Sequence, residues 1–189
     1  VAENHAINPI GIYAITNFAA ERIVLTYHNL HHIKSVCLRI TNTFGPRHQM
    51  AHDEYGVFNW FIRKAMDNEV IPIFGDGRIL RDYLYIDDLV DSLIAIALSD
   101  KAYGDVYNVG SGIPLSFIDL AEKIIKIAGS GKVDHTEFTT ERKALEPGDY
   151  YADITRIKNV LGWQPVISLD DGIRKTIQFY KKYKEHYWK

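Results

Sequence analysis

A few side chains in this sequence carry groups that do chemistry, at positions where such groups are used. Tyr13 and Asn17 are four residues apart, so on a helix they share one face. A tyrosine hydroxyl there can exchange a proton with a substrate, and an amide beside it can hydrogen-bond a ligand. Arg81 offers a planar, charged guanidinium with several N–H donors, which suits an anion. Asn42 follows a predicted strand, where α/β sheets place ligands.

Each of these residues also has a plain structural explanation. Tyr13 could be a packed helix residue, and Asn42 could be a turn former ahead of Gly45-Pro46. A single arginine such as Arg81 is usually a solvated surface residue. Position and residue type alone leave both interpretations open.

The elements that would position these residues follow from hydrophobic spacing and from turn and cap residues. We expect helices over residues 13–30, 57–66, 116–128, 154–161 and 168–183, and another from Asp87 or Asp88 to 98. We expect strands or extended segments over residues 35–40, 71–74, 84–86, 105–109 and 132–138. Residues 41–47 and 139–151 are expected to be loops. Because helices and strands alternate, the fold class is predicted to be α/β.

Composition limits the kinds of partner. The 189 residues suffice for one large domain, or for one domain with a piece of another. The net charge of -2 gives no bulk attraction to nucleic acid or to an anionic membrane, and no apolar run approaches the about 20 residues of a membrane span. The single cysteine, Cys37, indicates a cytoplasmic protein. No metal site is predicted, because His48 and His52 lack a second pair of ligands.

A dinucleotide-binding loop is missing from the sequence. Such a loop follows a strand, carries Gly-x-Gly-x-x-Gly and opens a helix. Gly110-Ser111-Gly112 is a partial match without the third glycine, and we expect it to be an ordinary loop. The chain begins at Val1, and we expect it to be a fragment or a processed form of a longer protein.

Several segments, taken in order, resemble the extended short-chain dehydrogenase/reductase family, specifically its NAD-dependent nucleotide-sugar epimerases and dehydratases. These segments are Asn8–Glu21, Leu38–Arg47, Phe74–Asp88, Tyr107–Gly112, Glu146–Asp153 and Leu161–Pro165. The sharpest match is Phe74–Asp88, which contains Gly75-Asp76-Gly77 and Arg81-Asp82. The resemblance covers nearly the whole chain.

The resemblance implies roles for individual residues. Tyr13 falls on the family's catalytic tyrosine and would take a proton from a sugar hydroxyl. Tyr13 and Asn17 would also contact the NAD cofactor. Asn42 and Arg81 would hold the diphosphate of the substrate. Asp82 and Asp87 are expected to serve the structure, as an ion pair and a helix cap.

Two positions depart from the family pattern. Asn17 stands where the family has a lysine whose charge favours the tyrosinate, so Tyr13 should be a weaker base. Glu146 stands where the family often has an arginine on the second side of the diphosphate. A carboxylate there would repel phosphate. Arg142, four residues earlier, is the expected replacement.

For the whole molecule, the resemblance implies the last part of a doubly wound Rossmann-type domain in residues 1–53. Residues 54–189 would form mainly a small mixed α/β substrate-binding domain, with some segments returning to the Rossmann sheet. The implied ligands are NAD and a nucleotide-diphosphate sugar, and the implied assembly is a homodimer through the helix at 13–30. The implied activity is most like that of a UDP-glucose 4-epimerase, with the fragment inactive alone. The alternative is a non-catalytic nucleotide-sugar-binding or structural module.

Overall fold

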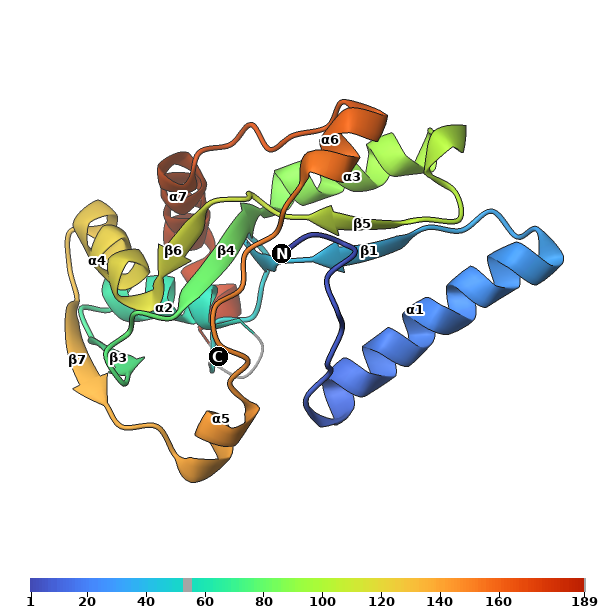
Figure 1. Cartoon of the computed structure of the whole chain (residues 1–189). Helices are drawn as coiled ribbons and strands as arrows, with labels where there is room; N and C mark the ends of the chain where they lie inside the picture. Colours follow the sequence, from blue (N-terminus) through green and yellow to red (C-terminus); the bar gives the residue numbers. More distant parts are fainter. Residues whose placement is uncertain (53–55, 189) are drawn as a thin grey trace.

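The computed structural model describes residues 1–52 and 56–188, without the side chains of residues 141 and 142. The expected domain boundary at residues 53 and 54 lies outside the described residues. Helices are interspersed with single strands or pairs of strands along the chain, as expected for an α/β protein, and the last three elements are helices (Figure 1). The helices are α1 (Gly11–His31), α2 (Val57–Met66), α3 (Ile86–Ala97), α4 (Phe117–Ala128), α5 (Thr140–Leu145), α6 (Thr155–Leu161) and α7 (Leu169–Tyr187), with a 3-10 turn at Asp100–Ala102. The strands are β1 (Cys37–Ile40), β2 (Asn42–Phe44), β3 (Val70–Phe74), β4 (Leu80–Tyr85), β5 (Val106–Val109), β6 (Pro114–Ser116) and β7 (Lys132–Thr136).

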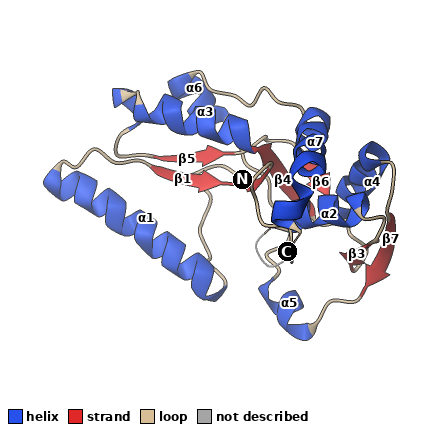
Figure 2. Cartoon of the chain, turned by 180° about the vertical axis from the view of Figure 1, so that it is seen from behind, coloured by secondary structure: helices blue, strands red, loops and turns tan. Residues whose placement is uncertain are grey.

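The described strands form three small sheets. Strand β1 pairs in parallel with β5, and β3 pairs in parallel with β7. Strand β4 lies between β2, which is parallel to it, and β6, which is antiparallel. This mixture of parallel and antiparallel pairs is what the mixed α/β expectation requires. The β1–β5 pair lies between α1 on one side and α3 with α6 on the other (Figure 2).

Two hydrophobic cores hold these layers together. The larger core joins α2, α4 and α7 to β3 and β4, and its fully buried members include Ile62, Ile71, Leu120 and Ile173. The smaller core packs β5 against α3 and α6, around Tyr107. Both cores place the strands at their centres, so the loops at the strand ends are held by rigid elements.

Two helices begin with the side-chain caps that the sequence predicts. The Ser116 hydroxyl accepts a hydrogen bond from the Asp119 backbone N–H at 3.1 Å, and the Ser168 hydroxyl accepts one from the Asp171 N–H, also at 3.1 Å. Helix α6 ends at Gly162, which has a φ of 70°, a conformation that glycine adopts without strain.

Helix α3 is different, and the expectation that Asp87 or Asp88 caps it is wrong. The cap residue is Tyr85, which makes no capping side-chain bond. The Asp88 carboxylate instead accepts the backbone N–H groups of Val166 and Ile167, each at 3.0 Å. Asp88 therefore ties a distant loop to the helix, and Asp87 is an exposed residue of the first turn.

Both predicted loops contain short regular elements. Residues 42–44 of the first form β2, because they pair with Tyr83–Tyr85 of β4. The second contains α5, which projects from the body of the molecule (Figure 1). Tertiary pairing and a helix of only six residues leave little signal in the local sequence.

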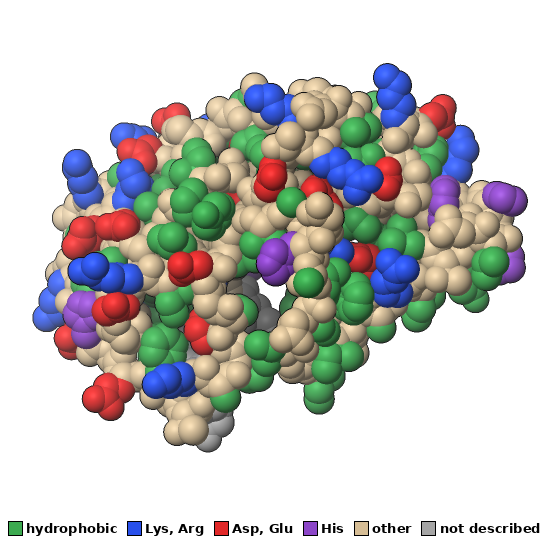
Figure 3. Space-filling model, in the orientation of Figure 1, with side chains coloured by type: hydrophobic (Ala, Val, Ile, Leu, Met, Phe, Trp, Pro, Cys, Tyr) green, Lys and Arg blue, Asp and Glu red, His purple; other side chains and the backbone are tan. Residues whose placement is uncertain are grey.

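Helix α1 buries only Leu25 among its described residues. Large apolar side chains on it stay exposed, namely Ile12, Tyr13, Ile15, Ile23, Val24, Tyr27 and Leu30. Figure 3 shows exposed hydrophobic side chains along this helix and histidines at its far end. A bidentate pair from Arg39 of β1 to Glu21 of α1, with both bonds at 2.8 Å, fixes the helix to the sheet. No helix in the described part of the chain is both long and apolar enough to cross a membrane.

Candidate functional site

Arg81 lies on β4 and is surrounded by acceptors. Its Nη1 donates to the carbonyl oxygens of Leu80 at 2.9 Å and Gly148 at 2.5 Å, and its Nη2 donates to the Glu146 carboxylate. The guanidinium carbon lies 5.6 Å from the centre of the Phe117 ring. The Arg81 side chain is 11% exposed and that of Glu146 is 23% exposed, so the pair is largely shielded from water. Arg81 is thus held rigidly and partly desolvated, which strengthens its interaction with an anion.

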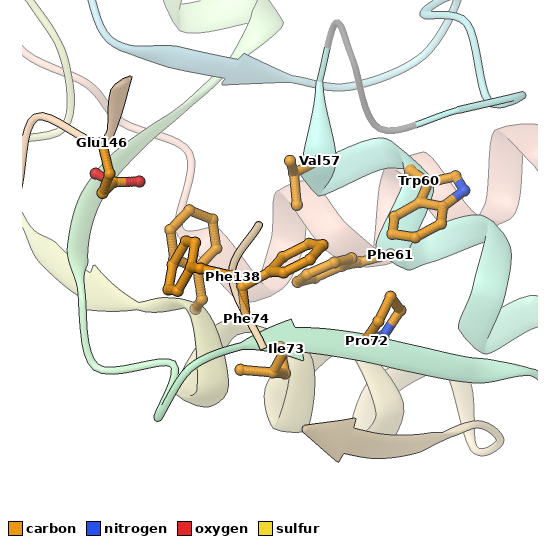
Figure 4. Close-up of a pocket in the computed structure, with 9 residues that line it drawn as sticks. Val57, Trp60, Phe61, Pro72, Ile73, Phe74, Phe138 and Glu146 are labelled. Atoms are coloured by element: carbon orange, nitrogen blue, oxygen red, sulfur yellow. The ribbon is translucent and has the colours of Figure 1, made fainter. Parts of the chain in front are cut away.

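Next to Arg81 is a cavity of about 140 Å³. Its walls come from α2, from β3, from the start of α4 and from the segment after β7, and are mainly aromatic and aliphatic (Figure 4). The lining residues are Val57, Trp60, Phe61, Pro72, Ile73, Phe74, Phe117, Phe138 and Glu146. Glu146 lies at the edge and is the only charged side chain among them. Flat aromatic walls of this kind suit a planar ring.

The cavity and Arg81 belong to one site. Glu146 lines the cavity and also bonds Arg81, and Phe117 lines the cavity and also stacks below the Arg81 guanidinium. A ligand with a planar ring and an anionic group next to it could therefore contact both at once. The sequence motif indicates Arg81 but none of the aromatic walls, because Phe138 meets Phe74 only in the folded chain, with ring centres 5.7 Å apart.

Asn42 lies beside the same strand. It is exposed on β2, directly opposite Tyr83 of β4, and its Nδ2 donates to the Asp82 carbonyl at 3.2 Å. The structure therefore brings Asn42 within two positions of Arg81 along β4. The side chain of Arg142, the expected replacement for a second arginine, lies outside the described residues, although its backbone belongs to α5.

Asp82 has a different role from the expected ion pair, and that expectation is wrong. The carboxylate is fully buried and accepts the backbone N–H groups of Ser111 at 2.8 Å, Gly112 at 3.0 Å and Ala152 at 3.1 Å. It also accepts the Ser111 hydroxyl at 2.6 Å. Backbone donors, with no cation among these bonds, stabilise the charge of Asp82.

The family-model comparison covers more than half of the chain. The model of the NAD dependent epimerase/dehydratase family matches residues 1–110. The chain belongs to this family. The resemblance inferred from the motifs is thereby confirmed.

Relatives and solved structures agree with this family and with its Rossmann-type fold. The chain is 33% identical to the low-salt glycan biosynthesis protein Agl12 of Haloferax volcanii, over 94% of this chain and 55% of that protein. It is 34% identical to a UDP-glucose 4-epimerase of Mycolicibacterium smegmatis, over 95% of this chain and 56% of that protein. The crystal structure of a UDP-glucose 4-epimerase from Thermotoga maritima with UDP-glucose superposes with a TM-score of 0.89 at 28% identity, over 97% of this chain and 58% of that one. The chain thus spans just over half the length of these relatives.

In this epimerase/dehydratase chain, the described residues do not fit a dinucleotide cradle. The glycine-containing turn after β5 is the nearest candidate, but the N–H groups of Ser111 and Gly112 point at the Asp82 carboxylate and are already used. Backbone N–H groups of this kind are what would bind a pyrophosphate. The expectation that this segment is an ordinary loop therefore has a physical reason: its N–H groups bond Asp82.

Tyr13 and Asn17 lie on the first turns of α1 in this family member. The Tyr13 side chain is 83% exposed. The Asn17 Nδ2 donates to the Tyr13 backbone carbonyl at 2.8 Å, so the amide turns to its own helix. A Cβ built on Gly11 would lie 3.4 Å from Leu145, the residue before Glu146. The beginning of α1 therefore lies beside the segment that carries Glu146.

Proposed function

We propose that the whole protein of which this sequence forms all or part is an epimerase or dehydratase acting on a nucleotide-diphosphate sugar, most like a UDP-glucose 4-epimerase. The observation that carries the proposal is the junction of Arg81 with the aromatic cavity. The base would stack in the cavity, and the diphosphate would lie on Arg81. The junction matches the chemistry of a nucleotide-diphosphate sugar, which joins a planar base to a short, doubly charged diphosphate.

The remaining site residues have proposed places around this ligand. Asn42, close to Arg81 along the sheet, would hydrogen-bond the substrate near its diphosphate, and Arg142 would assist from α5. Tyr13 would be the base that takes the sugar proton, and Tyr13 and Asn17 would contact NAD. The exposed apolar face of α1 supports a further proposal, a homodimer through this helix. The proposed domain division remains residues 1–53 and 54–189.

A second candidate is a nucleotide-sugar-binding or structural module without catalysis. Two observations favour it. Asn17 turns its amide to the helix backbone and brings no charge to Tyr13. The Glu146 carboxylate already accepts a hydrogen bond from the Arg81 guanidinium. Both candidates require a nucleotide-sugar site unless the module is purely structural, so the first measurement is binding.

Binding of UDP-glucose is measured by calorimetry on the wild type, Arg81→Gln and Arg78→Gln. Arg78 is a matched control, because its side chain is 84% exposed and lies three positions away on the same segment. We expect Arg81→Gln to weaken binding by about tenfold or more through loss of charge-assisted hydrogen bonds. Arg78→Gln should bind as the wild type does.

Phe138→Ala tests the cavity separately. The substitution should weaken the binding of UDP and of uridine alike, by roughly tenfold or more, because stacking on an aromatic ring is worth about 1–3 kcal/mol per base.

If the wild type does not bind UDP-glucose while circular dichroism shows a folded protein, a retained nucleotide-sugar site is contradicted. Equal binding by Arg81→Gln and Arg78→Gln would contradict the placement of the diphosphate.

A further inference from the structure

Glu146 is the anionic partner of Arg81. Its carboxylate accepts a hydrogen bond from Nη2 of Arg81, and the same carboxylate oxygen accepts one from the Gly148 backbone N–H at 3.2 Å. The Gly148 carbonyl oxygen accepts a hydrogen bond from Nη1 of Arg81 at 2.5 Å. Glu146 and Gly148 therefore each accept one hydrogen bond from the two Nη atoms of Arg81, which are donors that a phosphate would use.

We infer that Glu146 is an internal anion that competes with the ligand's diphosphate for Arg81, so that nucleotide binding exchanges one anion for another and Glu146 determines the affinity. This inference rests on the proposed function. It follows from the shared donors. A guanidinium presents a limited set of N–H groups, and a carboxylate left within a few ångström of a bound diphosphate would repel it.

The segment that carries Glu146 is built so that the carboxylate can move away. On the C-terminal side, Asp149 accepts the Leu80 N–H at 2.8 Å, and the Tyr150 N–H donates to the Leu80 carbonyl at 3.0 Å. On the N-terminal side, Lys143, Ala144 and Leu145 of α5 are exposed. Between them lies Gly148, with a φ of 79° and no atom within 4 Å of a Cβ built on it.

The C-terminal end of this segment is therefore bonded to β4, whereas the side chains of residues 143–145 at its N-terminal end are exposed. Motion of Glu146 would break its bonds to Arg81 and Gly148 but would leave the Asp149 and Tyr150 contacts to β4 intact. The pivot would be at residues 147–148, where glycine tolerates a change of backbone angle. The cavity beside Arg81 would then open toward the freed guanidinium, because Glu146 is one of its lining residues.

The test compares UDP with uridine, which share the base and the ribose but differ in the diphosphate. Calorimetric dissociation constants are measured for the wild type, Glu146→Gln, Glu146→Ala and the control Glu185→Gln. Glu185 is an exposed residue of α7 and is not among the residues that line the cavity. Its substitution therefore removes the same charge at a position outside the site. We expect both Glu146 variants to bind UDP about tenfold tighter or more, with uridine unchanged and Glu185→Gln like the wild type.

Each other outcome is informative. If UDP binds the wild type and the Glu146 variants do not bind it more tightly, the inference is wrong while the proposed function stands. If Glu146→Gln weakens the binding of both uridine and UDP, Glu146 is part of the nucleoside-binding surface and the inference is also wrong. If no form binds either ligand while circular dichroism shows each form folded, both the inference and the proposed function fail.

Discussion

At the residue scale, Asp82 is a buried side chain that connects distant segments of the chain. Its buried carboxylate joins β4 to the turn after β5 and to Ala152, segments separated by 29 to 70 positions in the sequence. A carboxylate in such a position can only be charged if backbone donors surround it, as they do here. Asp82 therefore positions the strand from which Arg81 projects.

Replacing Asp82 by Asn should lower the free energy of unfolding by about 2–4 kcal/mol. The amide nitrogen would face backbone N–H groups and would leave at least one buried donor unsatisfied. Urea unfolding followed by circular dichroism measures the change. Asp91→Asn, at an exposed position of α3, is the control and should stay within about 0.5 kcal/mol of the wild type. Equal effects of the two substitutions would show that the carboxylate is not needed.

At the element scale, α1 is attached to the rest of the chain by little more than one ion pair and one buried side chain. Arg39 is 24% exposed and Glu21 11% exposed, and their two bonds form a fork-to-fork pair. Leu25 is the buried apolar contact of this helix. A helix with so few buried contacts is expected to open without global unfolding.

Arg39→Gln should raise the rate of amide hydrogen exchange in α1, while exchange in α4 and in the larger core stays nearly unchanged. Mass spectrometry of peptides from residues 11–31 measures the difference. Lys34→Gln is the matched control, because the Lys34–Asp100 pair is exposed, at 68% and 83%, and such pairs contribute little. Identical exchange in the two variants would argue against the Glu21–Arg39 pair as the attachment of α1.

At the scale of the whole molecule, buried tyrosines link the fold to pH. Burial raises the pKa of Tyr180 to about 12, from an ordinary value of 10.0. Burial likewise raises the pKa of Tyr83. The unfolded chain releases these protons first, so it binds fewer protons than the folded chain between pH 10 and pH 12. The stability contribution is therefore complete below pH 10 and is lost as pH rises through the folded-state value.

The urea midpoint should fall as the pH rises from 10 to 12. Tyr180→Phe should flatten part of this fall, although its midpoint at neutral pH will be lower, because the Tyr180 hydroxyl accepts the His48 N–H at 2.9 Å. An unchanged slope in Tyr180→Phe would show that other groups cause the loss of stability.

The sequence predicts those parts of this molecule that depend on neighbouring residues. Helix α2 and the capped helices α4 and α7 were found because hydrophobic spacing and the serine caps are local signals. Strand β2 and the contacts of Asp82 and Asp88 were missed because their partners are distant along the chain. For the site, the motifs indicate Arg81 and Glu146, but the ion pair between them and the aromatic cavity arise only from tertiary packing.

The β1–β5 pair has one edge that is covered by other residues and one edge without a paired strand in the described part of the chain. On β5, the Asn108 N–H is covered by the Glu3 carboxylate at 2.9 Å, and the Asn108 amide donates to the Val1 carbonyl at 2.9 Å. Along the far edge of β1, no strand in the described part of the chain is paired. An uncovered strand edge is a template for another chain. In concentrated solution, this polypeptide is therefore expected to aggregate through the unpaired edge of β1. A charged residue or a proline in place of exposed Ile40 would reduce this aggregation.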